Sequence, residues 1–157
     1  MSMDYAEQYD KIYRYCYFKL HHREAAEDVT QETFLRFLNH QSSYGKGDSL
    51  KLLYTIARNL CTDEYRRKKA ELLPENWQER TGMSVPGPEE DCVTKSILHF
   101  ALQKLPEEDR ELILLRYVNE VPITSLTSLY KISRFALYRR CRKLLAFLKM
   151  EIEGGDG

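Results

Sequence analysis

The sequence has no long hydrophobic run. Its uninterrupted apolar stretches are only a few residues long, whereas a transmembrane helix needs about 20 apolar residues. The N-terminal stretch MSMDYAEQYDK also lacks the basic and then apolar order of a signal peptide. We therefore expect no membrane insertion and a cytoplasmic protein.

Closely spaced metal ligands and catalytic motifs are also missing. The chain has 4 cysteines and 4 histidines, with no CxxC pair that would indicate a zinc site or a redox dithiol. The cysteines are best interpreted as small buried apolar groups. The sequence contains no Walker loop, dinucleotide-binding fingerprint or Ser/His/Asp constellation. These absences predict no metal, no cofactor and no enzymatic activity.

The chain has no net charge, because 24 Lys and Arg residues balance 24 Asp and Glu residues. The two signs are nevertheless separated along the sequence. Residues 41–70 carry a net charge of +4 and residues 112–150 one of +7, while residues 1–40, 71–111 and 151–157 carry −2, −6 and −3. A solvated surface usually mixes both signs, so the two basic blocks indicate an anionic partner, of which nucleic acid is the commonest.

Hydrophobic residues recur at helical spacing, and no strand-like alternation appears. The first 70 residues predict three amphipathic helices. Their apolar positions are Tyr5, Tyr9, Ile12, Tyr13, Cys16 and Leu20 in the first, Ala26, Val29, Phe34, Phe37 and Leu38 in the second, and Leu50, Leu53, Tyr54, Ala57, Leu60, Cys61 and Tyr65 in the third. Residues 21–23 allow a tight link, and Asp48 or Ser49 is expected to cap the third helix.

Residues 71–91 interrupt the helical pattern. This segment contains three prolines, two glycines and an acidic run at its end, which is typical of a flexible linker. We therefore expect an all-α chain of two small helical domains, residues 1–70 and residues 92–157, joined by this linker.

The C-terminal part predicts a helix-turn-helix. One helix is expected to start at Pro106 and to reach about Val118, a short helix covers residues 122–130, and Ser133 is the expected N-cap of a longer last helix. Apolar residues recur where a three-helix core needs them. They are Leu126, Leu129, Ile132, Leu137, Cys141, Leu144, Leu145 and Leu148.

The last helix has the side chains that DNA reading requires. Arginine offers a bidentate fork to guanine, aromatic rings contact thymine methyl groups or sugars, and Arg140 and Lys143 can neutralise phosphates. A charged solvent-facing surface is the alternative, but such a surface normally includes Glu. The residues expected to be exposed toward DNA are Arg134, Phe135, Tyr138, Arg139 and Arg142.

The basic block at residues 57–69 lies near aromatic residues and a glycine-containing loop. Stacking surfaces beside cations favour unpaired bases. We expect Tyr54 to be a core residue, so Tyr44 of the loop and Asn59 are better candidates for contacts with bases.

Four segments resemble, in order, the extracytoplasmic-function (ECF) family of bacterial RNA polymerase sigma factors. They are AAEDVTQETFLRFL at 25–38, LLYTIARNLCTDEYRRKK at 52–69, LQKLPEEDRELILLRYVNEV at 102–121, and the helix-turn-helix. The resemblance covers nearly the whole chain. It implies that residues 1–70 are sigma region 2 and that residues 92–157 are sigma region 4. It also implies a function: binding core RNA polymerase and directing promoter-specific transcription initiation.

The resemblance implies roles for individual residues. The second helix would bind the clamp helices of the largest polymerase subunit through Asp28, Gln31, Glu32, Phe34 and Leu35. Minus-ten DNA would be bound by Tyr44, Lys46, Asp48, Asn59, Asp63, Arg66 and Arg67. The last helix would read the minus-thirty-five element through the five residues given above. The flap of the second-largest subunit and an anti-sigma factor are further implied partners.

Two departures from the family pattern concern DNA recognition. Leu52 stands where the family commonly has tryptophan, and Lys131 stands where the helix-turn-helix usually has glycine. The promoter sequence therefore cannot be inferred from relatives.

The alternative function is a standalone helix-turn-helix regulator with an N-terminal helical dimerisation or sensing domain. A protein-only adaptor or anti-sigma factor would leave the +7 block unexplained.

Overall fold

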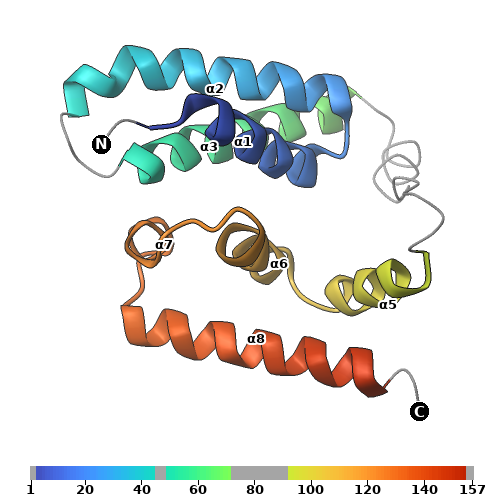
Figure 1. The fold of residues 1–157 in the computed structure, drawn as a ribbon. Coiled ribbons are helices and arrows are strands. Elements are labelled where there is room, and N and C mark those ends of the chain that lie inside the picture. The colour runs from blue at the N-terminus through green and yellow to red at the C-terminus, as the bar shows by residue number, and fades with distance from the viewer. Residues whose placement is uncertain (1–2, 45–48, 72–91, 155–157) are drawn as a thin grey trace. The chain divides into compact units, whose positions relative to one another are not determined.

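The protein is described from a computed structural model, which covers residues 3–44, 49–71 and 92–154. These residues form helices joined by short turns and no strand, which confirms the predicted all-α class. The chain divides into two compact units, Met1–Val85 and Pro86–Gly157. Figure 1 shows the helices of both units. Most of the predicted linker, from residue 72 to residue 91, lies outside the described residues.

The N-terminal unit is a bundle of three helices, α1 (Tyr5–Leu20), α2 (Arg23–Tyr44) and α3 (Ser49–Glu71). Each helix packs against the other two (Figure 1). At the centre, the ring of Tyr15 meets the ring of Tyr54 edge to face, with 5.6 Å between centroids. Both tyrosines are buried, as predicted for Tyr54. The remaining core includes Ile12, Cys16, Ala26, Phe37, Leu53, Ala57 and Cys61.

Local capping explains where these helices begin and end. Asp4 caps α1 by accepting a hydrogen bond at Oδ1 from the Glu7 amide, at 3.1 Å. His21 ends α1 with a left-handed φ of 54°, and its amide donates to the Tyr17 carbonyl at 2.8 Å. The Ala25 amide donates to His22 Nδ1 at 3.1 Å, at the start of α2. The tight link is therefore confirmed, whereas the predicted cap Asp48 lies outside the described residues.

The C-terminal unit contains α5 (Cys92–Gln103), α6 (Glu107–Ile113), the π-helix η2 (Leu114–Val118), α7 (Ile123–Tyr130) and α8 (Arg134–Gly154). Helices α5, α6 and α7 all pack against α8, and Figure 1 shows them along one side of it. The core is apolar. It includes Ala101, Leu105, Leu112, Leu115, Val121, Leu126, Leu129, Leu137, Cys141, Leu144 and Leu148.

The predicted helix from Pro106 to Val118 changes type before it ends. Pro106 precedes α6, and the first turn carries acids that suit the positive end of the helix dipole. After Ile113 the chain widens into η2, where the Asn119 amide donates to the Leu114 carbonyl, five residues back, at 2.8 Å. The predicted extent is thus confirmed, but the last turn is a π-turn.

Four residues of the predicted apolar stripes are exposed, namely Tyr5, Leu38, Tyr65 and Leu145. Leu38 is 52% exposed and Leu145 is 43% exposed, whereas their neighbours Phe37 and Leu144 are buried. Consecutive residues of an α-helix point about 100° apart, so both members of such a pair cannot face the same core. The periodic pattern assigned one residue too many to each buried stripe.

The predicted burial of the cysteines is confirmed for Cys16, Cys61 and Cys141, which are free thiols. A hydrogen bond with Cys61 lowers the pKa of the Cys16 thiol against the opposing effect of burial. The side chain of Cys92 lies outside the described residues. No helix in the described parts of the chain is long and apolar enough to cross a membrane.

Candidate nucleic-acid and protein interfaces

Helix α2 presents a solvent-exposed face opposite its buried one. Asp28, Gln31, Glu32 and Leu35 are all exposed, and their spacing places them on one side of the helix. Leu35 is 60% exposed, which is more than a residue of a single buried stripe would be. Four of the five predicted polymerase-binding residues therefore share one accessible surface, called here the α2 face.

Phe34, the fifth predicted polymerase-binding residue, is only half-buried and is braced by α1. Its ring lies 5.6 Å from the Tyr9 ring and 6.5 Å from the Tyr5 ring, measured between centroids. Glu32 accepts a hydrogen bond from Arg36 Nε at 2.8 Å. Because this pair is exposed, it contributes little to stability and leaves a carboxylate at the surface.

Helix α3 carries the described part of the predicted minus-ten site. Asn59, Asp63 and Arg66 are exposed and recur at four and three residues, so they lie on one face. Arg67 is also exposed, but its guanidinium donates to Glu64 Oε2 at 2.7 Å and to Glu71 Oε1 at 2.9 Å. The hydrogen bond with Glu64 is the main reason why the pKa of Arg67 is raised. The two neighbouring arginines therefore differ: Arg67 is already occupied by acids.

Most of the loop part of the predicted minus-ten site falls outside the part of the chain that the structure describes. Lys46 and Asp48 lie outside the described residues, and Tyr44 is described only as the last residue of α2. Leu52, which stands where the family commonly has tryptophan, is half-buried.

The predicted helix-turn-helix is formed by α7, a short turn and α8. Lys131 ends α7 with a left-handed φ of 59°, and its amide donates to the Thr127 carbonyl. The Ala136 amide donates to Ser133 Oγ at 3.1 Å, which confirms Ser133 as the N-cap of α8. Leu126 and Leu137 are buried between the two helices and the rest of the unit. The turn thus adopts the glycine-type conformation although a lysine occupies it.

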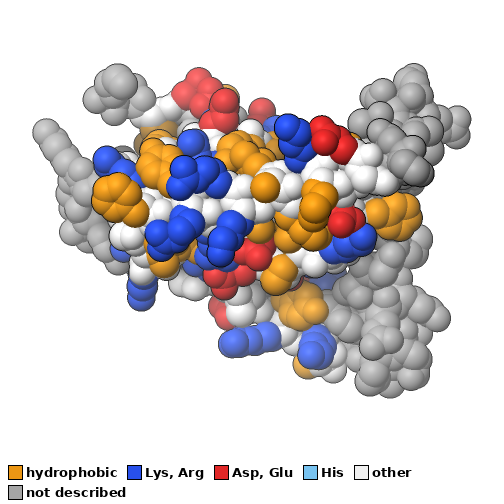
Figure 2. Space-filling model, turned by 90° about the horizontal axis from the view of Figure 1, so that it is seen from below, with side chains coloured by type: hydrophobic (Ala, Val, Ile, Leu, Met, Phe, Trp, Pro, Cys, Tyr) orange, Lys and Arg blue, Asp and Glu red, His pale blue; other side chains and the backbone are white. Residues whose placement is uncertain are grey.

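All five residues predicted to read the minus-thirty-five element are exposed on α8. Phe135 is 78% exposed, more than any other large hydrophobic side chain in the described part of this unit. Residues 134–150 contain no acid. Figure 2 shows Lys and Arg side chains interspersed with hydrophobic ones along α8. This surface has the cations and apolar groups that phosphate and base contacts require.

Arg140 contacts side chains of two other helices. Its guanidinium donates to Asp109 Oδ1 at 2.6 Å and 2.9 Å and to Glu108 Oε1 at 3.0 Å. It also lies over the ring of Tyr130, at 5.7 Å from the centroid. Tyr130 in turn donates to the buried Glu111 carboxylate at 2.6 Å. These contacts tie α8 to α6 and α7, and the phosphate contact of Arg140 stays a prediction.

Sequence reasoning missed this cluster, called here the Arg140 cluster, because its members are distant along the chain. Asp109 and Arg140 are 31 residues apart. Burial disfavours the charged guanidinium, but the hydrogen bonds with Asp109 and Glu108 outweigh it, so the pKa of Arg140 is raised. The acids at the start of α6 suit the helix dipole, which does not predict a partner on α8. The sequence signal for a basic partner is the excess of these acids over the basic residues nearby.

Known proteins resemble this chain in sequence and in fold. Residues 5–71 match the family model of Sigma-70 region 2. The chain is 30% identical over 125 residues to the ECF RNA polymerase sigma factor BldN of Streptomyces coelicolor, a match that covers 76% of this chain and 47% of BldN. It therefore spans less than half of BldN. It is 27% identical over 158 residues to the ECF RNA polymerase sigma factor SigM of Bacillus subtilis, covering 93% of this chain and 94% of SigM.

The fold also has a counterpart among solved structures. The sigma factor RpoE from Bartonella quintana, crystallised in complex with the anti-sigma factor NepR, superposes with a TM-score of 0.65 at 18% identity. The match covers 92% of this chain and 91% of that one. At this identity the likeness concerns the fold alone, whereas the region 2 match and the relatives concern the sequence. The sequence matches show that residues 5–71 form a Sigma-70 region 2 and that the chain is similar over most of its length to ECF RNA polymerase sigma factors.

Proposed function

We propose that this protein is a sigma factor that binds core RNA polymerase and directs promoter-specific initiation of transcription. One observation supports this proposal most directly: a helix-turn-helix exposes an acid-free surface with Phe135 and Arg139 on α8. It stands in the same chain as a segment that matches Sigma-70 region 2. Like sigma factors in general, the protein would act by binding and not as an enzyme, and it would act in the cytoplasm.

The proposed polymerase contact is the α2 face together with Phe34. Its exposed acids would pair with basic side chains, and the exposed Leu35 would be covered by the clamp helices of the largest subunit. The flap of the second-largest subunit would bind the C-terminal domain. An anti-sigma factor is a further proposed partner, by analogy with the RpoE–NepR complex.

The proposed DNA contacts are divided between two domains, residues 1–70 and residues 92–157, joined by residues 71–91. The first would bind the minus-ten element through α3 and the preceding loop, and the second would bind the minus-thirty-five element through α8. Once one domain is bound, the linker raises the effective concentration of the other. Two DNA contacts of modest affinity can then together bind a promoter tightly enough to select it.

The proposal is tested with the purified chain and core RNA polymerase. We expect the two to co-elute from a gel-filtration column and to direct run-off transcription, and sequencing the transcripts would identify the promoters used. The charge reversal Arg139→Glu/Arg142→Glu should abolish transcription and leave co-elution unchanged. Lys149→Glu is the matched control, because Lys149 is exposed on α8 but lies near its other end.

Two results would contradict the proposal. A chain that neither co-elutes with polymerase nor supports transcription, while binding duplex DNA tightly by itself, would be a standalone helix-turn-helix regulator. Loss of co-elution in the Arg139→Glu/Arg142→Glu variant would mean that the polymerase and DNA surfaces have been interchanged.

A further inference from the structure

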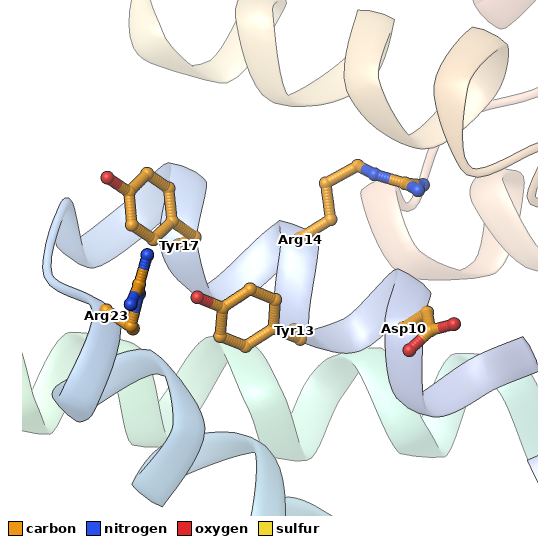
Figure 3. A pocket seen from close by; sticks show the side chains of 5 residues that line it. All are labelled: Asp10, Tyr13, Arg14, Tyr17 and Arg23. Carbon is orange, nitrogen blue, oxygen red and sulfur yellow. The ribbon is translucent and has the colours of Figure 1, made fainter. Parts of the chain in front are cut away.

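The outer side of α1 contains a hollow that belongs to none of the surfaces described above. It has a volume of about 480 Å³ and is lined by Asp10, Tyr13, Arg14 and Tyr17 of α1 and by Arg23 at the start of α2 (Figure 3). This volume is within the range of small-ligand sites, about 300–1,000 Å³. All five residues belong to the N-terminal unit, and the hollow is called here the α1 hollow.

Two tyrosines form the aromatic wall of the α1 hollow. Tyr13 and Tyr17 lie one helical turn apart, with ring centroids separated by 6.2 Å and planes inclined by 37°. The sequence predicted Tyr13 as part of the buried stripe, but both rings are only half-buried. Tyr15, between them in sequence, is the tyrosine that enters the core. Tyr13 and Tyr17 therefore keep aromatic surface available at the edge of the bundle.

The charged side chains are distributed around this wall. In Figure 3 the Arg23 side chain extends beside Tyr17, while Arg14 and Asp10 lie toward the other end of the hollow. Two guanidinium groups and one carboxylate give the lining a net charge of +1, although residues 1–40 as a whole carry −2. The hollow is therefore locally positive within an acidic segment.

We infer that the α1 hollow binds a nucleotide, with the base stacked on Tyr13 and Tyr17 and the phosphate held by Arg23. Aromatic faces beside cations are the usual way in which proteins bind unpaired bases. A guanidinium offers paired donors to phosphate oxygens. Asp10 is a suitable acceptor for an amino group of the base, which favours cytosine over thymine. The nucleotide could belong to a single strand or be a free nucleoside phosphate, since both present the same base and phosphate.

The test measures binding to the full chain by fluorescence anisotropy with two probes. One is a short fluorescein-labelled oligodeoxycytidylate, and the other is a fluorescent N-methylanthraniloyl nucleoside triphosphate. The variants Tyr13→Leu/Tyr17→Leu and Arg23→Gln should weaken binding of at least one probe roughly tenfold or more. Leucine keeps apolar volume, and glutamine keeps part of the polar stem, so the fold should be retained, which thermal unfolding will check.

Matched controls lie on the same helices but outside the α1 hollow. Tyr5→Leu removes an α1 tyrosine that packs on Phe34, and Arg36→Gln removes an exposed α2 arginine. Neither should change the affinity for the probes by more than about twofold. Arg66→Gln, on the exposed face of α3, shows how much of the strand binding is due to that helix.

Each outcome decides a part of the inference. If the variants of the α1 hollow weaken only the oligonucleotide, the ligand is a nucleotide of a strand; if they weaken the nucleoside triphosphate, it is a free nucleotide. If neither probe is affected, or only Arg66→Gln weakens the oligonucleotide, the inference is overturned. Co-elution with polymerase and transcription are not readouts here, so failure of the proposed function would leave this test intact.

Discussion

Arg140 is positioned by side chains from two other helices. Its side chain is 28% exposed, and its guanidinium bridges Asp109 and Glu108 while lying over the Tyr130 ring. A partly buried, multiply hydrogen-bonded charge stabilises a fold more than an exposed ion pair does. Arg140 therefore orients α8, whereas the exposed arginines on α8 are available to a partner.

We expect Arg140→Met to destabilise the C-terminal unit. The loss should be about 1–2 kcal/mol, because charged hydrogen bonds disappear and the two acids lose their cation. Urea unfolding followed by circular dichroism measures it. Lys143→Met is the control, since Lys143 is exposed on the same helix and should change stability by less than about 0.5 kcal/mol. Equal effects of the two substitutions would mean that the Arg140 cluster has no special role.

Lys131 adopts the conformation that glycine usually provides in this turn. Its φ of 59° is left-handed, which is unfavourable for a residue with a Cβ atom. We expect Lys131→Gly to stabilise the C-terminal unit by about 0.5–1 kcal/mol and Lys131→Val to destabilise it. The midpoint of thermal unfolding should move up and down accordingly. A lower midpoint for Lys131→Gly would show that the lysine side chain makes a compensating interaction.

Single residues were predictable from sequence where a local rule decides their place. Ser133 as an N-cap and Tyr54 as a core residue follow from neighbours within a turn or two, and both are confirmed. Leu38 and Leu145 were assigned wrongly because each adjoins a truly buried residue and periodicity alone does not choose between them. The pairing of Arg140 depends on the packing of α8 against α6, which no local pattern contains.

At the scale of the element, α2 has two apolar sides with different surroundings. Phe37 is buried in the three-helix core, whereas Leu35, two residues earlier, is 60% exposed. Phe37 therefore contributes to the stability of the fold, whereas Leu35 belongs to the proposed contact with polymerase, and the two roles can be tested by separate substitutions.

We expect Leu35→Glu to leave the thermal unfolding midpoint nearly unchanged and to abolish co-elution with core polymerase. Phe37→Ala should instead cost about 3–5 kcal/mol of stability, because it leaves a cavity in the core. Gel filtration with polymerase and thermal unfolding of the free protein distinguish the two effects. If Leu35→Glu still co-elutes, the α2 face is not the polymerase contact.

Two adjacent arginines on α3 differ in availability. Arg67 is held by Glu64 and Glu71 on its own helix, whereas Arg66 shares an exposed face with Asn59 and Asp63. We expect Arg66→Gln to reduce promoter melting several-fold and Arg67→Gln to reduce it less. Permanganate reactivity of thymines in the polymerase complex measures melting. The opposite order would mean that Arg67 exchanges its acids for phosphate on binding.

At the scale of the whole molecule, zero net charge is the result of segments of opposite sign. Basic residues gather on α3 and α8, and acids gather in the segments between and around them. The acids repel DNA at long range, while the basic faces attract it at contact. Binding of free DNA by the isolated protein should therefore be weak.

We expect this weak binding to depend on salt with a modest slope. If two or three phosphates are neutralised, the logarithm of the affinity for promoter duplex should fall with the logarithm of the salt concentration with a slope of about −2 to −3. The Arg139→Glu/Arg142→Glu variant should flatten the slope. Filter binding over a range of salt concentrations tests this, and a wild-type slope near zero would exclude phosphate contacts as the source of affinity.

The all-α class and the helix-turn-helix could be predicted for the whole chain because both depend on repeated local signals. Helical spacing recurs in every described element, and Pro106 and Ser133 mark helix starts. The α1 hollow could not be foreseen, since it depends on Arg23 of α2 lying beside tyrosines of α1. The roles of the predicted polymerase and DNA residues stay predictions.

The π-turn of η2 has a consequence for the alignment of related sequences. A π-turn contains one residue more than an α-turn and commonly arises where a residue has been inserted into a regular helix. The widened turn of this chain covers Leu114–Val118. Relatives in which this helix is regular throughout should therefore align with a gap of one residue here, and an ungapped alignment would shift every position of α7 and α8 by one. Comparisons of the residues that read DNA depend on placing that gap correctly.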